Sequence, residues 1–308
     1  MNESKQLDLR GFSGNKIEVI RLEGETFVRK TAKDSSFNFK MEKEIDKIKE
    51  LEKIAKISKN FKVPKIRSVK KNQHGLLVYE LEFVPGESLD VCLYNMNSKK
   101  IKFFAKKLGQ IINELSVKIV VNKLEEKDFI LKKFNELDLE LNKKKDSTGI
   151  GKELFNEYSE KIKKLKIKES DLANEDTFCH GDLALDNILI TKRNEIYLID
   201  PLFNDFESVM WDYAKILQSS MTYWNLIKYQ NFQLIPNYKK IIITPNEHIS
   251  MFHKHFLKNL RGINPSTILL YLAATLARVA KYAKTDKQLF ALIIIINELL
   301  TDYSNGKC

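Results

Sequence analysis

The feature that most constrains this chain is an ordered run of polar residues directly before an apolar strand. "FCHGDLALDNILI" covers residues 178–190, and a second apolar run, "IYLID", closes at Asp200. Acids and an amide at the entrance of a buried strand contribute nothing to its packing. The two runs are joined by the four residues 192–195, a common length for a hairpin loop. We therefore expect a β-hairpin whose open end carries side chains with a chemical task.

Three oxygen-bearing side chains belong to that open end: Asp182, Asn187 and Asp200. A hairpin brings the start of its first strand beside the end of its second, so Asn187 and Asp200 should lie close together. Amide and carboxylate oxygens, together with phosphates, are the ligands that Mg²⁺ prefers. Asp182 precedes the strand and could orient or deprotonate an acceptor hydroxyl. Each residue alone is typical of turns and caps, and only the ordered combination favours catalysis.

Residues 1–84 are predicted to form a sheet with one helix. "KIEVIRLEGETFVRK" alternates apolar and polar residues around a turn at Glu23–Glu25, which indicates a hairpin. "FNFKMEKEIDKIKELEKIAKI" places its apolar residues at helical spacing. "GLLVYELEFV" at 75–84 is a third strand-like run, and it stops at Pro85-Gly86. This turn signal predicts a boundary between a first domain, 1–84, and a second, 85–308.

Residues 85–308 are predicted to be mostly helical outside the hairpin. "SKKIKFFAKKLGQIINELSVKIV" has one long helical period, with Ser98 as its expected N-cap. Residues 123–170 suggest amphipathic helices, and helices should continue from Ser208 to the end. The most apolar stretches, near 266–277 and 289–300, are shorter than the ~20 residues that span a bilayer. We expect them to be buried helices, and we expect no membrane span.

The net charge limits the classes of binding partner that we expect, and the cysteines indicate the cellular compartment. A net charge of +11 allows nucleic acid, anionic lipid or a phosphorylated ligand. The lysines, however, are scattered among glutamates, and the sequence has no RNA-binding aromatic motif or zinc spacing, so we expect no nucleic-acid partner. Cys92, Cys179 and Cys308 are far apart and odd in number, which argues against a disulfide framework. With a polar N-terminus that lacks a signal-peptide core, these features favour a reducing, cytoplasmic location.

The pattern "HGDLALDNILI…LID" resembles the signature of the aminoglycoside phosphotransferase/choline kinase family, relatives of protein kinases that phosphorylate small molecules. The resemblance implies an α+β, bilobal protein-kinase-like fold. Its small N-lobe, an antiparallel sheet with one helix, would bind the nucleotide, and its larger, mainly helical C-lobe would hold the catalytic loop and the acceptor. The implied reaction moves the γ-phosphate of ATP, with Mg²⁺, to a hydroxyl of a sugar, amino sugar or amino alcohol.

The resemblance also assigns roles at the hairpin and in the sheet. Asp182 would be the catalytic base, while Asn187 and Asp200 would bind Mg²⁺ and, with it, the nucleotide. Lys30, at the end of "TFVRK", would contact the α- and β-phosphates. A strand-end lysine is usually only solvated, and Lys33 lies nearby, but a helix with acidic residues follows Lys30 and favours it.

Three further roles depend on the same resemblance. Glu44 would steady Lys30, with Glu42 as its rival, although a solvated glutamate is nearly as good an interpretation of either. "YELEFVPGESL" resembles the hinge at which backbone groups of Glu82 to Val84 would meet adenine. Asp212, in "MWDYAK", matches an aspartate that buttresses the catalytic loop, although an exposed helical acid is a fair alternative.

Two segments give weaker signals. "GFSGNK" at 11–16 would be the loop over the phosphates, although a simple turn has the same glycines. "SSMTYWNLIKYQ" at 219–230 could line a sugar or alcohol site, but packing of Tyr223, Trp224 and Tyr229 within the helical region is favoured. The sequence therefore leaves the acceptor, the oligomeric state and the choice between ATP and GTP open.

The sequence departs from the motifs of protein kinases and choline kinases, and these differences rank the alternative functions. Gly181 stands where a protein kinase carries the arginine that senses a phosphorylated activation loop, and Asp200 is followed by Pro201-Leu202 instead of Phe-Gly. A kinase of proteins is thereby disfavoured. Choline kinases usually have asparagine at the position that Gly181 occupies in this chain, which weakens the choline or ethanolamine alternative. A nucleotide-binding pseudokinase is disfavoured because the three chemical positions are intact. A basic RNA- or membrane-associated protein would require the motif to be a coincidence.

Overall fold

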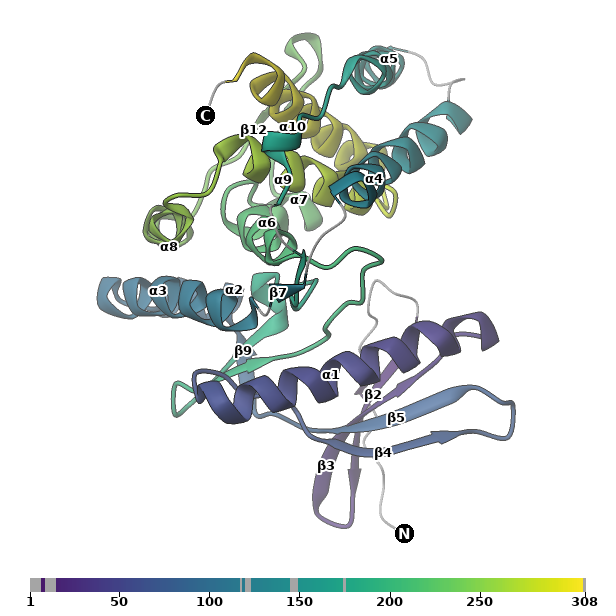
Figure 1. Ribbon diagram of the computed structural model, residues 1–308, viewed down its shortest axis with the longest axis vertical. Coiled ribbons are helices and arrows are strands. Elements are labelled where there is room, and N and C mark those ends of the chain that lie inside the picture. Colours follow the sequence, from purple (N-terminus) through teal and green to yellow (C-terminus); the bar gives the residue numbers. More distant parts are fainter. Residues whose placement is uncertain are drawn as a thin grey trace. The chain divides into compact units, whose positions relative to one another are not determined.

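The computed structural model describes residues 7–8, 15–116, 118–119, 123–144, 149–173 and 176–306 (Figure 1). The chain divides into two compact units. Unit 1 combines Met1–Cys92 with Asp186–Phe203, and unit 2 combines Leu93–Leu185 with Asn204–Cys308. The first segment of unit 1 thus ends eight residues after the predicted boundary at 84, and the hairpin around residue 190 belongs to unit 1. The assignment of nucleotide and acceptor functions to these units stays a prediction.

Unit 1 contains the antiparallel sheet expected from the alternating sequences. The strand order is β1-β2-β3-β5-β4, with β1 Leu7–Asp8, β2 Lys16–Leu22, β3 Glu25–Thr31, β5 Leu77–Glu82 and β4 Ile66–Lys71. The predicted hairpin and third strand are confirmed. The edge strand β4, which was not predicted, has the sequence IRSVKK and leaves most of its side chains exposed, so it lacks an apolar alternation.

One long helix accompanies this sheet, as predicted. Helix α1, Asn38–Ser58, lies along the sheet (Figure 1). Its buried apolar residues, Met41, Ile45, Ile48 and Leu51, follow the three- and four-residue spacing of a helix face. Ile54 and Ala55, expected on the same face, are only partly buried. The helix therefore contributes its central turns, more than its last ones, to the core of unit 1.

A second sheet in unit 1 contains the predicted hairpin. Its order is β10-β9-β6, with β6 Gly86–Ser88, β9 Ile188–Thr191 and β10 Ile196–Leu198. The short helix α2, Leu89–Cys92, directly follows β6 in the chain. Both pairings are antiparallel. A Cβ atom on Gly86 would lie 2.9 Å from the carbonyl oxygen of Ile190. Glycine at this position therefore permits the close approach of β6 to β9.

Unit 2 is built around a buried central helix. Residues 270–277 of α9 are almost completely buried, and α9 contacts α4, α6 and α10. The long helices are α3 Ser98–Leu115, α4 Lys123–Lys143, α5 Ile150–Lys164, α6 Val209–Ser220, α8 Glu247–Phe256, α9 Pro265–Ala280 and α10 Asp286–Asn305, with the short α7 Trp224–Lys228. The 3₁₀ helices of the chain are Ser35–Phe37, Leu93–Asn95, Glu169–Asp171, Leu185–Asn187, Pro236–Tyr238 and Leu257–Leu260. No helix in the part of the chain that the structure describes is long and apolar enough to cross a membrane.

Three details of unit 2 differ from the expectation. Ser98 is the first residue of α3 and not its cap: the side chain of Asn97 caps the helix by accepting a hydrogen bond from the Lys100 N–H. The region after Ser208 is not wholly helical either, because β11 Gln233–Ile235 pairs with β12 Lys240–Ile242. A further short pair joins β7 Lys118–Ile119 to β8 Asp176–Thr177. Strands of two or three residues are too short to give a periodic signal.

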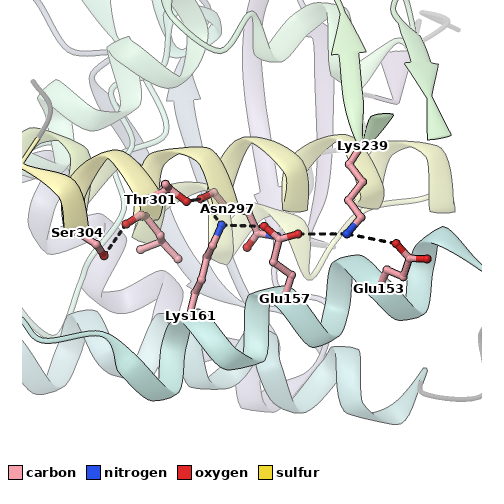
Figure 2. Close-up of polar contacts among 8 residues, drawn as sticks. Glu153, Glu157, Lys161, Lys239, Asn297, Thr301 and Ser304 are labelled. Atoms are coloured by element: carbon pink, nitrogen blue, oxygen red, sulfur yellow. Dashed lines mark hydrogen bonds and ion pairs between the residues drawn. The ribbon is translucent and has the colours of Figure 1, made fainter. Parts of the chain in front are cut away.

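A polar seam joins α5 to α10 and to the β11–β12 turn (Figure 2). Lys161 of α5 donates to Glu157 at 2.8 Å and crosses to the backbone carbonyl of Asn297 on α10 at 2.9 Å. Lys239, in the turn between the two strands, lies 3.2 Å from Glu153 and 3.6 Å from Glu157. The seam thus ties three consecutive turns of α5 to two other elements of unit 2.

Candidate active site

Lys30 is buried in unit 1 between two carboxylates. Its ammonium lies 2.6 Å from Oε1 of Glu44 and 3.3 Å from Oδ1 of Asp200, and the Tyr79 hydroxyl donates to the same Glu44 oxygen at 2.7 Å. Glu42 is exposed. Position 44 falls between the buried positions 41 and 48, which place it on the sheet-facing side of α1. Of the two glutamates left open by the sequence, Glu44 is the partner of Lys30.

The electrostatics of this cluster fix the charge of Lys30. Burial alone would lower the pKa of Lys30, but the charges of Asp200 and Glu44 outweigh it and hold that pKa well above the usual value for lysine. The ammonium therefore stays protonated throughout the neutral range. Unit 1 holds a fixed positive charge at the end of β3, beside a carboxylate of the hairpin.

Asn187 and Asp200 lie at the same end of the hairpin, as expected. The backbone N–H of Ile199 donates to the carbonyl of Asn187 at 3.0 Å, one step beyond the paired residues Leu198 and Ile188. Lys47 of α1 donates to the carbonyl of Leu202 at 2.6 Å and holds the segment after the hairpin. The ladder thus continues to Asn187 and to Ile199, the residue directly before Asp200.

Asp200 combines a rare backbone conformation with exposure of its side chain. Its φ of 53° is left-handed, a conformation that is uncommon for a residue other than glycine and recurs at functional sites. Its side chain is 44% exposed, so carboxylate oxygen remains accessible to a ligand. Within the described ranges, no group of three His, Cys, Asp or Glu side chains could hold a metal. One carboxylate with one amide fits Mg²⁺, which keeps waters and binds substrate phosphates.

Asp182 belongs to unit 2 and is held by two cations. Its Oδ1 lies 2.8 Å from the ammonium of Lys215 on α6 and 3.3 Å from Nη2 of Arg278 on α9. Burial raises the pKa of Asp182, but the charges of Lys215 and Arg278 outweigh it and lower that pKa to about 2. The carboxylate is therefore ionised at neutral pH, although its side chain is only 29% exposed.

The sequence did not predict Lys215 or Arg278. Lys215 follows Asp212 by three residues on α6, so the spacing could have placed both on the face that meets the catalytic loop. Nothing in the sequence marks Arg278, because its approach to Asp182 depends on how α9 packs in unit 2.

Asp212 buttresses the loop that carries Asp182. The side chain is completely buried, and its two oxygens accept the backbone N–H groups of His180 and Gly181, both at 2.7 Å. Gly181 has a φ of 83°, which glycine adopts without strain. The alternative of an exposed helical acid is wrong for Asp212, and the expected buttress is present.

The remaining predicted site residues have mixed outcomes. The Glu82 N–H already donates to the carbonyl of Lys65, and the Val84 carbonyl accepts from the N–H of Gly86, both at 2.9 Å. Adenine binding at Glu82 to Val84 therefore stays a prediction. The glycines of "GFSGNK" lie outside the described residues. Tyr229 is 66% exposed, so it is not a packing aromatic.

Comparisons with known proteins identify the family of this chain and solved structures with a similar fold. The model of the phosphotransferase enzyme family matches residues 9–228. The comparison with curated proteins gives no match. Among solved structures, the GDP complex of a mutant aminoglycoside 2′-phosphotransferase IIIa has a TM-score of 0.62 at 12% identity, over 99% of this chain and 95% of that chain.

Two ternary complexes are similarly related. The streptomycin–ATP complex of APH(2″)-IIa has a TM-score of 0.58 at 15% identity, over 98% of this chain and 92% of that chain. A thermostable mutant of aminoglycoside phosphotransferase APH(4)-Ia with ADP and hygromycin B has a TM-score of 0.57 at 9% identity, over 98% and 94%. At such identities the likeness shows a shared fold, which confirms the predicted α+β protein-kinase-like class.

Proposed function

Because the chain belongs to the phosphotransferase enzyme family, we propose that it is a kinase of small molecules that transfers the γ-phosphate of ATP to a hydroxyl group. The observation that carries this proposal is the buried Lys30 ammonium held between Glu44 and Asp200. A fixed cation beside an accessible carboxylate is what a magnesium–triphosphate requires from a protein. A purely structural ion pair would not need the exposed, left-handed Asp200.

In this proposal unit 1 binds the nucleotide. Lys30 offsets the charge of the α- and β-phosphates, and Glu44 keeps its side chain directed. Asn187 and Asp200 would hold Mg²⁺, which would supply positive charge to offset the charge that develops on the phosphates. The backbone of Glu82 to Val84 would bind the base. Structures of the same fold contain either GDP or ATP. GTP and ATP are therefore both candidates for the phosphate donor.

Asp182 would act on the acceptor hydroxyl. A carboxylate with a pKa of about 2 is a weak base toward an alcohol, so its first task is to accept the hydroxyl hydrogen bond and orient the oxygen. It would take the proton only as the new P–O bond forms. This timing suits phosphoryl transfer, whose loose transition state needs little activation of the nucleophile. Lys215 and Arg278 would keep Asp182 ionised and directed.

The proposed acceptor class is a sugar, an amino sugar or an amino alcohol. Structures of this fold were solved with streptomycin and with hygromycin B, which supports a polyhydroxylated acceptor. Pro201 and Leu202 after Asp200 do not provide the switchable segment of protein kinases. The odd number and wide spacing of the three cysteines in the sequence support the proposed reducing, cytoplasmic location.

The test is a screen of Mg²⁺-dependent ATP and GTP consumption against aminoglycosides, sugars, amino alcohols and nucleosides. Asp182→Asn keeps the size of the side chain but removes the charge that orients the hydroxyl. We expect it to lower turnover by about 10² or more while nucleotide binding, measured by calorimetry, is retained.

Glu42→Gln is the matched control, because it removes one charge from an exposed position of α1. We expect it to behave as the parent does. An Asp182→Asn variant that turned over the accepted substrate at the parental rate would refute the role of Asp182. No consumption with any acceptor in the panel would favour the alternative of a nucleotide-binding module.

A further inference from the structure

A small cavity in unit 2 is lined by the loop glycine Gly181 and, among its other lining residues, by three basic side chains. Three helices each contribute one of them: Lys133 from α4, Lys215 from α6 and Arg278 from α9. The cavity has a volume of about 10 Å³, which is room for one water-sized group. A single oxygen atom of a larger ligand fits that space.

The basic side chains around this cavity differ in whether a carboxylate lies close to them. Lys215 and Arg278 share one oxygen of Asp182. Lys281, just beyond α9, pairs with Glu136 of α4. In the described part of the chain, no carboxylate lies within ion-pair distance of Lys133, whose ammonium instead sits 4.1 Å from the centre of the Phe129 ring. Lys133 is thus a cation at this cavity that has no carboxylate partner among the residues that the structure describes.

Lys133 is held in a place that disfavours its charged form. Burial, followed by the nearby charge of Arg278, lowers the pKa of Lys133 to about 8, with smaller effects of Lys281 and Lys132 in the same direction and an opposing effect of Glu136. Gathering like charges in a partly buried place costs free energy. A bound anion would recover that cost, because it would interact with Lys133 and Arg278 at once.

We propose that this cluster binds an anionic group of the acceptor, so that the substrate is a hydroxyl compound carrying a phosphate or a carboxylate. The inference rests on the proposed kinase function, because it places this group next to the hydroxyl that Asp182 would orient. Arg278 touches both Asp182 and the cavity, so the two groups of one small molecule would lie close together. An aminoglycoside, which carries several ammonium groups, would be repelled by the same cluster.

The first test measures anion binding without nucleotide. Sulfate is the probe, because its charge does not change between pH 7 and 9, and binding is followed by calorimetry and by the rise in melting temperature. Lys133→Met should weaken sulfate binding at least about tenfold, the usual effect of losing a charge-assisted hydrogen bond. Lys133→Arg should restore binding and separate loss of charge from loss of fold.

Lys132→Met is the matched control. It removes the neighbouring charge of the same helix from a side chain that is 55% exposed and paired with Asp205, so sulfate binding should change little. Sulfate affinity should be constant below the pKa of Lys133, about 8, because the ammonium is already charged. Above it, binding must take up a proton, so affinity should fall by up to about tenfold per pH unit.

The second test compares acceptors in matched pairs: glycerol with glycerol 3-phosphate, glucose with glucose 6-phosphate and with gluconate, and an aminoglycoside as the cationic arm. We expect ATP consumption with the anionic members and a raised KM for them in Lys133→Met. The phosphate and carboxylate arms distinguish the two kinds of anion.

The outcomes separate the two proposals. Turnover of neutral or cationic acceptors that is indifferent to Lys133→Met would overturn the anion site and leave the kinase function standing. Sulfate binding that depends on Lys133, without ATP consumption on any acceptor, would uphold the anion site and refute the kinase assignment. Equal loss of sulfate binding in Lys132→Met and Lys133→Met would show a general charge effect and overturn the proposal.

Discussion

At the scale of single residues, the loop that carries Asp182 depends on Asp212. Both of its oxygens accept backbone hydrogen bonds from the loop, and none of its side chain is exposed. A buried carboxylate normally carries a high desolvation cost, which hydrogen bonds to the charged form offset. The position of Asp182 thus depends on a residue thirty positions further along the chain.

Asp212→Asn should destabilise the protein by about 1–3 kcal/mol. The variant keeps the shape, but one acceptor oxygen is replaced by an NH₂ group that faces a backbone N–H. Asp212→Ala should cost more, because both N–H groups lose their acceptor in a buried place. Urea denaturation, followed by circular dichroism, measures the difference in free energy of unfolding.

Asp205→Asn is the control for this prediction. It removes a carboxylate of the same unit whose side chain is 69% exposed, and we expect no measurable change in stability. Equal effects of the Asp212 and Asp205 variants would mean that the loop does not need its buttress.

The sequence predicted those site residues whose meeting depends on local pattern. Lys30 and Glu44 meet because the phase of β3 and α1 directs both inward, and Asn187 and Asp200 because a hairpin joins its own ends. Arg278 reaches Asp182 only through the packing of α9, which no local pattern contains. Residues that helix packing brings together were therefore the part of the site that the sequence could not supply.

At the scale of elements, we can test whether the polar seam between α5 and α10 contributes to the stability of unit 2 (Figure 2). Lys161 is 27% exposed and joins Glu157 to the Asn297 carbonyl of the other helix. Lys161→Met keeps the apolar stem but removes three donors, and we expect a loss of about 1–2 kcal/mol in the free energy of unfolding. Thermal and urea denaturation should agree on the direction.

Lys163 provides the comparison on the same helix. Its side chain is 68% exposed and, among the residues that the structure describes, pairs with Glu160 alone, three positions away. Exposed pairs within one helix contribute little, so Lys163→Met should be neutral. If the two methionine variants were equally stable, the seam would have no role in joining the helices.

The elements that the sequence missed share a physical cause. β4 presents Arg67, Val69 and its two lysines to solvent, while β11 and β12 have three residues each. Such strands form because a partner completes their hydrogen bonds, and their own sequences carry little periodic signal. The long, half-buried elements were predicted because burial of one face imposes a period on the sequence.

At the scale of the whole molecule, nucleotide binding should stabilise the chain according to which site residues it retains. Mg²⁺–ATP at a hundred times its dissociation constant adds about 2.7 kcal/mol to the folded state. We expect a rise in melting temperature for the parent and for Asp182→Asn, which leaves unit 1 intact. Asp200→Ala should show little rise, because it removes both a proposed magnesium ligand and a partner of Lys30.

Two controls accompany this measurement. EDTA should abolish the rise in the parent, since the nucleotide would lack its counter-ion. Asp46→Ala, at an exposed position of α1, should respond as the parent does. A rise in Asp200→Ala equal to that of the parent would contradict the proposed metal site.

The division of the chain into units has a consequence for how such a protein can be recombined. Unit 1 is assembled from two separated segments, and the second of them, Asp186–Phe203, interrupts unit 2. A gene fusion that transplanted the first 92 residues would carry Lys30 and Glu44 but leave Asn187, Asp200 and the strand that pairs with β6 behind. Unit 1 is therefore not transferable as one contiguous segment: it can be inherited or engineered only together with the part of unit 2 that separates its two segments.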